Sequence, residues 1–142
     1  MSGKSLITPE MECMVGMEFG PDIYDIEKGM VQKYVAALED LNPRWLRETP
    51  PTYVMSACHL VPMEEWLMSL RHLPNMLNGG MEMENFLPVK PGDVITVTGK
   101  LLELVERTGK TIERMVVAVF ENSFFNQRGE LVARGRMTFI KY

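Results

Sequence analysis

The second half of the chain contains four segments with β-strand patterns, separated by short turns. They span residues 81–86, 94–105, 111–125 and 131–142. These segments are rich in β-branched and aromatic residues or alternate apolar with polar positions, which is typical of strands in a sheet. Short turns join antiparallel neighbours. The pattern therefore predicts an antiparallel sheet, and it leaves the helical part of the fold to the first half of the chain.

Turn residues and side-chain alternation refine this prediction. The segment Asn126–Gly129 has the composition of a tight hairpin turn, and Gly129 suits a positive φ. The run Met115–Phe120 is continuously apolar, which predicts a central strand covered on both faces. In the last segment, Ala133, Gly135 and Phe139 share one face of the strand, while the arginines between them take the other.

The first half of the chain contains helical patterns. A short strand or hairpin is expected within residues 15–26. Apolar residues from Met30 to Leu38 then form one stripe, which predicts an amphipathic helix that stops at Pro43. A second helical region lies within residues 52–73, and Pro62 is expected to split it in two. This order of elements predicts an α+β fold, with an antiparallel sheet wrapped around a helix.

Length, charge and composition bound the function. At 142 residues and 46% apolar content, we expect one globular domain over residues 15–142, preceded by a flexible arm over residues 1–14. The net charge of −4, without a basic run, excludes nucleic acid as a partner. No apolar window is long enough to cross a membrane, and the N-terminus lacks a signal-peptide core. We therefore expect a cytoplasmic protein without a membrane partner.

The sequence gives no indication of a metal or a cofactor. Cys13 and Cys58 are too few and too far apart for a disulfide framework or a zinc site. The glycines at Gly79 and Gly80 lack the strand–turn–helix context of a dinucleotide-binding loop. The thirteen methionines fit an adaptable apolar pocket and ordinary core filling equally well.

Two polar residues, Asp40 and Asn42, precede Pro43 at the predicted end of the first helix. Asp and Asn in such positions often cap the helix and turn the backbone, and spacing alone favours this role. However, the segment Asp-Leu-Asn-Pro over residues 40–43, after a Tyr- and Ala-rich helix, resembles the signature of MaoC-like hydratases and dehydratases. The other matching pieces are Gly16, residues 50–52, 78–84, 88–93 and 122–130, and the Arg-containing last strand, so that the resemblance covers roughly residues 15–142.

This resemblance implies a hotdog fold and chemistry on acyl thioesters. Such enzymes add or remove water at a 2-enoyl thioester, with a carboxylate and an imidazole that together hold the water. The resemblance implies Asp40 and Asn42 as catalytic residues, but the family's His, five positions after the Asp, is Trp45 here. The glycine that commonly polarises the thioester carbonyl has no match near Thr52. The substrate-binding residues that we predict are Trp45, Thr52, Met55, His59, Met63 and Gly79.

We therefore expect an acyl-thioester-binding hotdog subunit of an (R)-specific enoyl-CoA hydratase or 3-hydroxyacyl dehydratase. Its ligand would be an acyl-CoA or an acyl-carrier-protein thioester. Because an open sheet leaves its edge strands uncovered, we also expect a homodimer or a heterodimer with a second hotdog subunit. The chain would be a weak enzyme alone, or the substrate-binding half of an enzyme that is active only with its partner.

Two alternatives stay open. The missing His would also fit a non-catalytic acyl-CoA-binding or scaffold subunit of a lipid-metabolising complex. An acyl-CoA thioesterase would use a carboxylate near the central helix, where Glu64 and Glu65 lie. We rank the thioesterase lower, because the Asp-x-Asn-Pro segment is not what that group uses. The cations Arg107, Lys110 and Arg114 could meet coenzyme A phosphates, although a solvated surface explains them better.

Overall fold

The computed structural model describes residues 3–142. For residues 61, 62 and 64 it describes the backbone only. The strands are β1 (Glu18–Asp25), β2 (Met76–Asn85), β3 (Val94–Thr108), β4 (Arg114–Phe125) and β5 (Leu131–Lys141). The helices are α1 (Pro9–Cys13), α2 (Lys28–Leu38), α3 (Tyr53–Ala57) and α4 (Val61–Ser69), with a 3-10 helix, η1, at Pro43–Leu46. Among these residues, no helix has the length and apolar content needed to cross a bilayer.

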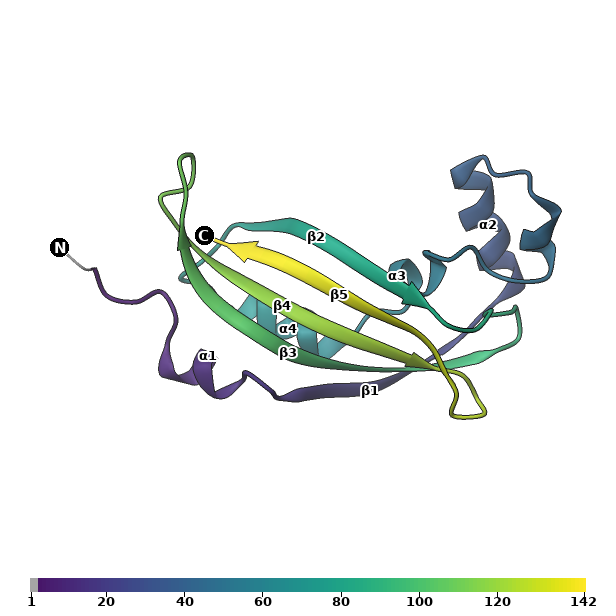
Figure 1. The fold of residues 1–142 in the computed structure, drawn as a ribbon, viewed down its shortest axis with the longest axis horizontal. Coiled ribbons are helices and arrows are strands. Elements are labelled where there is room, and N and C mark those ends of the chain that lie inside the picture. The colour runs from purple at the N-terminus through teal and green to yellow at the C-terminus, as the bar shows by residue number, and fades with distance from the viewer. Residues whose placement is uncertain (1–2) are drawn as a thin grey trace.

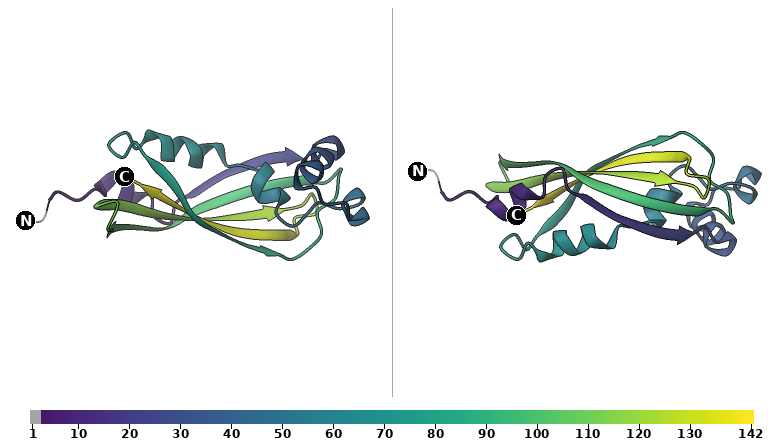
Figure 2. Two further views of the ribbon diagram at one scale, coloured as in Figure 1. Left: turned by 90° about the horizontal axis from the view of Figure 1, so that it is seen from above. Right: turned by 90° about the horizontal axis from the view of Figure 1, so that it is seen from below.

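The five strands form one antiparallel sheet in the order β1-β3-β4-β5-β2. Helix α4 lies along one face of this sheet, and no helix of the described chain covers the opposite face (Figures 1 and 2). Helix α2 and η1 project beyond one end of the sheet, whereas α1 lies at the other end (Figure 1). The predicted α+β arrangement, an antiparallel sheet around a central helix, is confirmed.

The core lies between α4 and the inner face of the sheet. Phe120 of β4 is fully buried at its centre. The Trp66 ring of α4 meets the Phe120 ring edge-on, with the centroids 5.5 Å apart. Phe19 of β1 and Phe139 of β5 each lie 6.0 Å from the Phe120 ring. This aromatic cluster joins the helix to strands on both sides of β4, so that the burial of its apolar area stabilises the packing of α4 on the sheet.

Two glycines let the central helical segments approach the sheet closely. A Cβ atom at Gly99 would lie 2.3 Å from Cδ1 of Leu60, in the link between α3 and α4. A Cβ atom at Gly135 would lie 1.8 Å from Sδ of Met55. Gly99 of β3 and Gly135 of β5 both pair with Asn122 of β4, so the residues on either side of Asn122 in the sheet have no side chain. Glycine is used here for close packing rather than for backbone freedom.

Two predicted boundaries and one predicted burial pattern are wrong. Helix α2 ends at Leu38 rather than at Pro43, because Glu39 adopts a left-handed conformation with φ of 54°. Strand β2 begins at Met76, so Gly79 and Gly80 lie within a strand. The apolar run Met115–Phe120 is buried on alternate positions only, since the outer face of the sheet carries no helix. The split of the central helix near Pro62 is confirmed by the break between α3 and α4.

The N-terminal segment is packed against the end of the sheet. Thr8 caps α1 through its side chain, and Met11 is buried in the core. Nearby, Glu106 accepts hydrogen bonds from Leu6 N and from Arg114 Nε, at 3.1 and 2.9 Å. Arg114 is therefore part of an ion pair that holds this segment. The flexibility of residues 1–14 and the domain limits stay predictions.

Candidate active site

Asp40 lies just after the end of α2 and is held by two hydrogen bonds. Its Oδ2 accepts a hydrogen bond from Nε1 of Trp45 at 2.7 Å, and its Oδ1 accepts one from the backbone N–H of Asn42 at 3.1 Å. The left-handed Glu39 turns the chain so that the residues five positions apart meet. The resemblance placed an acid and its partner at these two positions, and the structure brings Asp40 and Trp45 together.

Asn42 has a structural task in this turn. Its Oδ1 accepts a hydrogen bond from the backbone N–H of Arg44 at 3.0 Å, which caps the start of η1. Pro43 at the first helical position needs no such partner, since it has no N–H. The Asn-Pro pair therefore shapes the loop that carries Trp45 toward Asp40, and the Asn42 oxygen is engaged by the backbone.

The electrostatics of the pair favour the ionised carboxylate. The hydrogen bond from Trp45, followed by that from the Asn42 backbone, lowers the pKa of Asp40 below its ordinary value. The indole nitrogen of Trp45 is a hydrogen-bond donor only, without a lone pair that could accept a proton. Asp40 thus has a fixed donor as its partner, where a dyad for proton transfer would need a group that both accepts and releases a proton.

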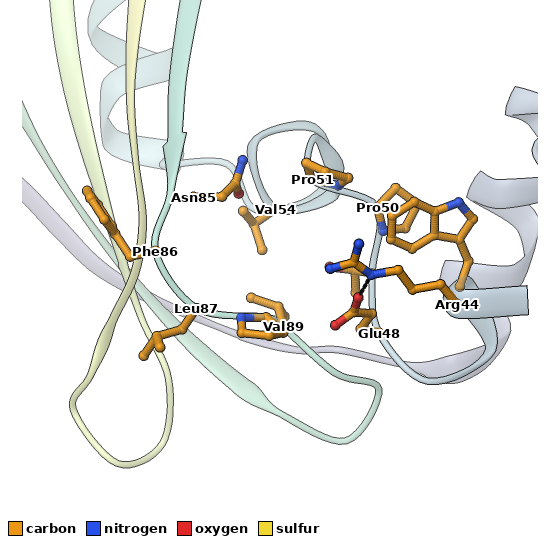
Figure 3. A pocket seen from close by; sticks show the side chains of 12 residues that line it. Arg44, Glu48, Pro50, Pro51, Val54, Asn85, Phe86, Leu87 and Val89 are labelled. Carbon is orange, nitrogen blue, oxygen red and sulfur yellow. Dashed lines mark hydrogen bonds and ion pairs between the residues drawn. The ribbon is translucent and has the colours of Figure 1, made fainter. Parts of the chain in front are cut away.

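The Trp45 side chain lines two hollows of the protein surface. One is a cleft of about 230 Å³ between η1 and the β2–β3 connection (Figure 3). The Arg44 guanidinium lies 5.6 Å from the centre of the Trp45 ring and forms an ion pair with Glu48. The cleft is lined by Arg44, Trp45, Glu48, Thr49, Pro50, Pro51, Val54 and residues 85–89. The other hollow is a groove of about 730 Å³ along α2, with Asp40 and Leu41 among its walls.

A separate apolar pocket of about 330 Å³ opens between α4 and the strands β2 and β5. It is lined by His59, Met63, Leu67, Met68, Met76, Met137 and Phe139. Met63 is buried, whereas the side chains of Met68 and Met76 are 71% and 44% exposed and stand at the opening. Methionine side chains adapt to apolar ligands of varied shape, so this pocket suits a flexible hydrocarbon chain.

The predicted binding residues are spread over several places. His59 and Met63 share the apolar pocket, and Trp45 lines the cleft. Met55 is buried against Gly135 and lines none of these hollows. Gly79 lies beside the side chains of Thr138 and Ile140, on the outer face of the sheet.

Neither histidine lies in the motif segment with Asp40. The His59 carbonyl accepts a hydrogen bond from the Tyr24 hydroxyl, and His72 Nε2 lies 3.1 Å from the Leu6 carbonyl oxygen. Across residues 3–142, no group of three or more His, Cys, Asp or Glu side chains could hold a metal ion.

Three residues at these sites are not among the predicted site residues. The sequence pattern predicts Tyr34 within the apolar stripe of its helix, but its hydroxyl contacts Thr52 and Ser56. Met76 precedes the strand predicted over residues 81–86, but it lies at the mouth of the apolar pocket. Met137 of the last predicted strand lines the same pocket and is not among the predicted binding residues. Its alternation with the arginines of that strand was the one signal that could have found it.

A family model with the description "FAS1-like, dehydratase domain region" matches residues 13–135. The chain belongs to this dehydratase family. The predicted membership of the MaoC-like hotdog hydratases and dehydratases is thereby confirmed. No curated protein sequence matches the chain.

Solved structures share the fold of this dehydratase-family chain at low identity. The HadBC (3R-hydroxyacyl-ACP dehydratase) complex of Mycobacterium tuberculosis is 19% identical, with 89% of this chain and 96% of that chain covered, and a TM-score of 0.70. The ChsH1–ChsH2 complex of Mycobacterium tuberculosis is 14% identical over 89% of both chains, with a TM-score of 0.74. The (R)-hydratase of A. caviae is 21% identical over 88% and 94%, with a TM-score of 0.56. These likenesses confirm the hotdog fold.

Proposed function

We propose that this chain is the acyl-thioester-binding hotdog subunit of an (R)-specific enoyl-CoA hydratase or 3-hydroxyacyl dehydratase, without a complete catalytic dyad of its own. The observation that carries the proposal is the hydrogen bond of 2.7 Å between the Asp40 carboxylate and the Trp45 indole. It joins the two positions at which the resemblance implies an acid and its imidazole partner. The family match over residues 13–135 supports the class of chemistry.

The chemistry explains why the Trp45 position decides this point. Hydration needs one group that takes a proton from water and one that gives a proton to the substrate carbon. Asp40 could accept a proton, but its pKa is lowered and one of its oxygens is taken by the indole. The indole can neither take up the proton nor pass it on. Binding can persist under these conditions, while turnover requires a dyad from another subunit.

The apolar pocket supports the binding of an acyl chain. Its walls come from α4 on one side and from β2 and β5 on the other, with Met63, Met137 and Phe139 facing one another across it. Each buried methylene of a ligand contributes about 0.8 kcal/mol, so affinity should rise with the length of acyl chain that the pocket accommodates. The carrier, coenzyme A or an acyl carrier protein, would remain outside the pocket.

An exposed sheet edge supports a second hotdog subunit. Strand β2 pairs only with β5, so its other edge is free among the described residues. Met76, Leu77 and Met81 on this strand are 44%, 45% and 48% exposed. A ten-residue edge strand with exposed apolar side chains is a template for pairing with another chain. The HadBC and ChsH1–ChsH2 structures are complexes, and a partner with an intact dyad would supply the groups that this chain lacks.

Calorimetric titration with butyryl-CoA tests the binding role. We expect saturable binding by the purified chain and weaker binding by Met63→Asp, which places a charge in the pocket. Glu65→Gln, at an exposed position of α4, is the matched control and should bind like the wild type. Absence of saturable binding by the wild type, alone and with a copurified hotdog partner, would refute the proposal.

A scaffold subunit is the second candidate, and exposed leucines favour it. Leu41 and Leu46, beside Asp40, are 94% and 64% exposed, which leaves an apolar surface on the α2–η1 projection. Such a surface could hold another enzyme of lipid metabolism. For a thioesterase, the Glu65 side chain is exposed and lines no apolar pocket, while the Glu64 side chain lies outside the described residues.

A further inference from the structure

The outer face of the sheet, opposite α4, is not covered by any helix of the described chain (Figure 2). Four apolar side chains form one row across this face, one from each of four neighbouring strands. They are Val105, Val117, Ile140 and Leu77, which pair in this order across β3, β4, β5 and β2. The first three are half-buried, and Leu77 is 45% exposed. A contiguous apolar row on an uncovered sheet face indicates a surface on which a second layer packs.

A row of charged side chains crosses the same face further along the strands. Lys100 of β3 pairs with Glu121 of β4. Arg136 of β5 pairs with Glu121 on one side and with Glu82 of β2 on the other. Glu121 Oε2 accepts a hydrogen bond from Arg136 Nε at 3.1 Å, yet the Arg136 side chain is 55% exposed. From β3 to β2, the charges therefore alternate as positive, negative, positive and negative.

This order of charges is complementary to its own reverse. A two-fold rotation about an axis parallel to the strands, between β4 and β5, places β4 of one copy over β5 of the other and β3 over β2. Arg136 then faces the partner's Glu121, and Lys100 faces the partner's Glu82. A two-fold interface requires self-complementarity of this kind, because the same patch is used on both subunits.

The apolar row is compatible with the same rotation. Val117 faces the partner's Ile140, and Val105 faces the partner's Leu77, so that apolar side chains meet apolar side chains. Two sheets that pack face to face keep their strand directions within about 30° of each other, so rows close to the axis stay opposite one another. Any apolar partner would fit the first row, but a second copy of this chain also matches the alternating charges of the second.

We propose that the outer face of the sheet binds a second copy of this chain, sheet against sheet, about a two-fold axis between β4 and β5. This surface is distinct from the β2 edge, which stays available for a second hotdog subunit in both copies. The inference goes beyond the proposed function and does not depend on it, since no ligand takes part. One assembly would contain two copies of the chain, each with a free β2 edge.

Two charge reversals that compensate each other test the proposal. Arg136→Glu places a glutamate opposite the partner's Glu121, and Glu121→Arg places an arginine opposite the partner's Arg136. Each variant alone should self-associate at least about tenfold more weakly than the wild type, because like charges then face one another. An equimolar mixture of the two should regain the association, because every charge of the row then faces its opposite. Sedimentation velocity over a series of concentrations measures the masses.

Two controls show that the effect comes from this face. Arg128→Glu reverses the same charge in the turn between β4 and β5 and should keep the wild-type mass. Circular dichroism should show folded protein for every variant, since the changed side chains are not buried. Lys100→Glu and Glu82→Lys form a second compensating pair at the ends of the row, and their mixture should regain association in the same way.

The outcomes separate this interface from pairing at the β2 edge. Pairing at that edge affects the wild type and the variants alike, so each single variant should have half the wild-type mass in either case. In the mixture, neither chain holds an ion pair between positions 121 and 136, so recovery can come only from contacts between chains. A monomeric wild type, single variants of wild-type mass, or a mixture that stays at the lower mass would overturn the proposal. Binding of butyryl-CoA is measured separately, so a failure of the proposed function would leave this result unchanged.

Discussion

The central strands and the α2–η1 segment, residues 28–46, are held by different kinds of interaction. Strands β3, β4 and β5 share long antiparallel ladders, and their inner side chains are almost fully buried. The α2–η1 segment projects from the end of the sheet, with Val31 as its one buried hydrophobic residue. Its turn is fixed by the side chains of Asp40 and Asn42. The sheet thus provides most of the stability, and the α2–η1 segment contains the candidate catalytic residues.

The largest expected contrast between the two regions concerns single apolar truncations. Phe120→Ala removes a fully buried ring that contacts three others, and we expect it to cost about 3–5 kcal/mol of unfolding free energy. Leu41→Ala removes a side chain that is 94% exposed and should change stability by less than about 0.5 kcal/mol. Urea denaturation of both variants measures the difference. Similar losses would show that the α2–η1 segment is packed more tightly than the structure indicates.

Glycine substitutions give a smaller effect within the sheet itself. Gly99→Ala would push a methyl group into Leu60 and the Asn122 side chain, and overpacking of this kind costs about 1–3 kcal/mol. Gly80→Ala is the matched control, because its added methyl meets no atom within 4 Å. Thermal unfolding should therefore separate the two variants clearly. A stable Gly99→Ala variant would contradict the close contact between the α3–α4 link and the sheet.

The Asp40–Trp45 contact predicts a titration difference. In Trp45→Phe the indole donor is lost, so the pKa of Asp40 should rise toward the ordinary value of an aspartate. Because the pKa of Asp40 is lowered in the folded protein, the contact stabilises the fold above the unfolded pKa, and this stabilisation is lost as the pH falls through the folded pKa. Carboxyl-carbon NMR of wild type and variant measures it. An unchanged Asp40 pKa would show that the hydrogen bond from the indole does not lower it.

The smallest expected contrast concerns the reactivity of the two cysteine thiols. Burial raises the pKa of Cys58 to about 12, whereas Cys13 is exposed. At pH 8, an aromatic disulfide reagent should modify one thiol of the native protein quickly and the second only after denaturation, because the thiolate is the reactive form. Cys13→Ser should remove the fast phase. Rapid modification of Cys58 in the native state would show that the region between α3 and α4 opens readily.

Much of the sheet could be predicted because its signals are local. The turn Asn126–Gly129 joins β4 and β5 as expected, with Gly129 at φ of 74°. The alternation in the last strand also places its arginines outward. The start of β2 was missed, because Asn78, Gly79 and Gly80 have the composition of a loop. They are extended in the structure only through pairing with β5, across a bulge that no local pattern predicts.

The candidate site was also predictable in part, because some of its signals are local in the sequence. The family motif pointed to Asp40 and position 45, and their spacing along the chain made a contact possible. The helix end at Leu38 was missed, because the competition between Asp40, Asn42 and the helical backbone cannot be ranked from propensity alone. The contact of Tyr34 with Thr52 joins two separate elements, so only their packing in three dimensions could show it.

The hydration of crotonyl-CoA by the purified chain tests the central claim most directly. Wild type and Asp40→Asn would be assayed side by side, after calorimetry has shown that the wild type binds butyryl-CoA. Since the Trp45 indole cannot transfer a proton, the account predicts no hydration above the uncatalysed rate by either protein. Hydration by the wild type alone that disappears in Asp40→Asn would contradict it, because Asp40 would then act as a catalytic residue without a partner subunit.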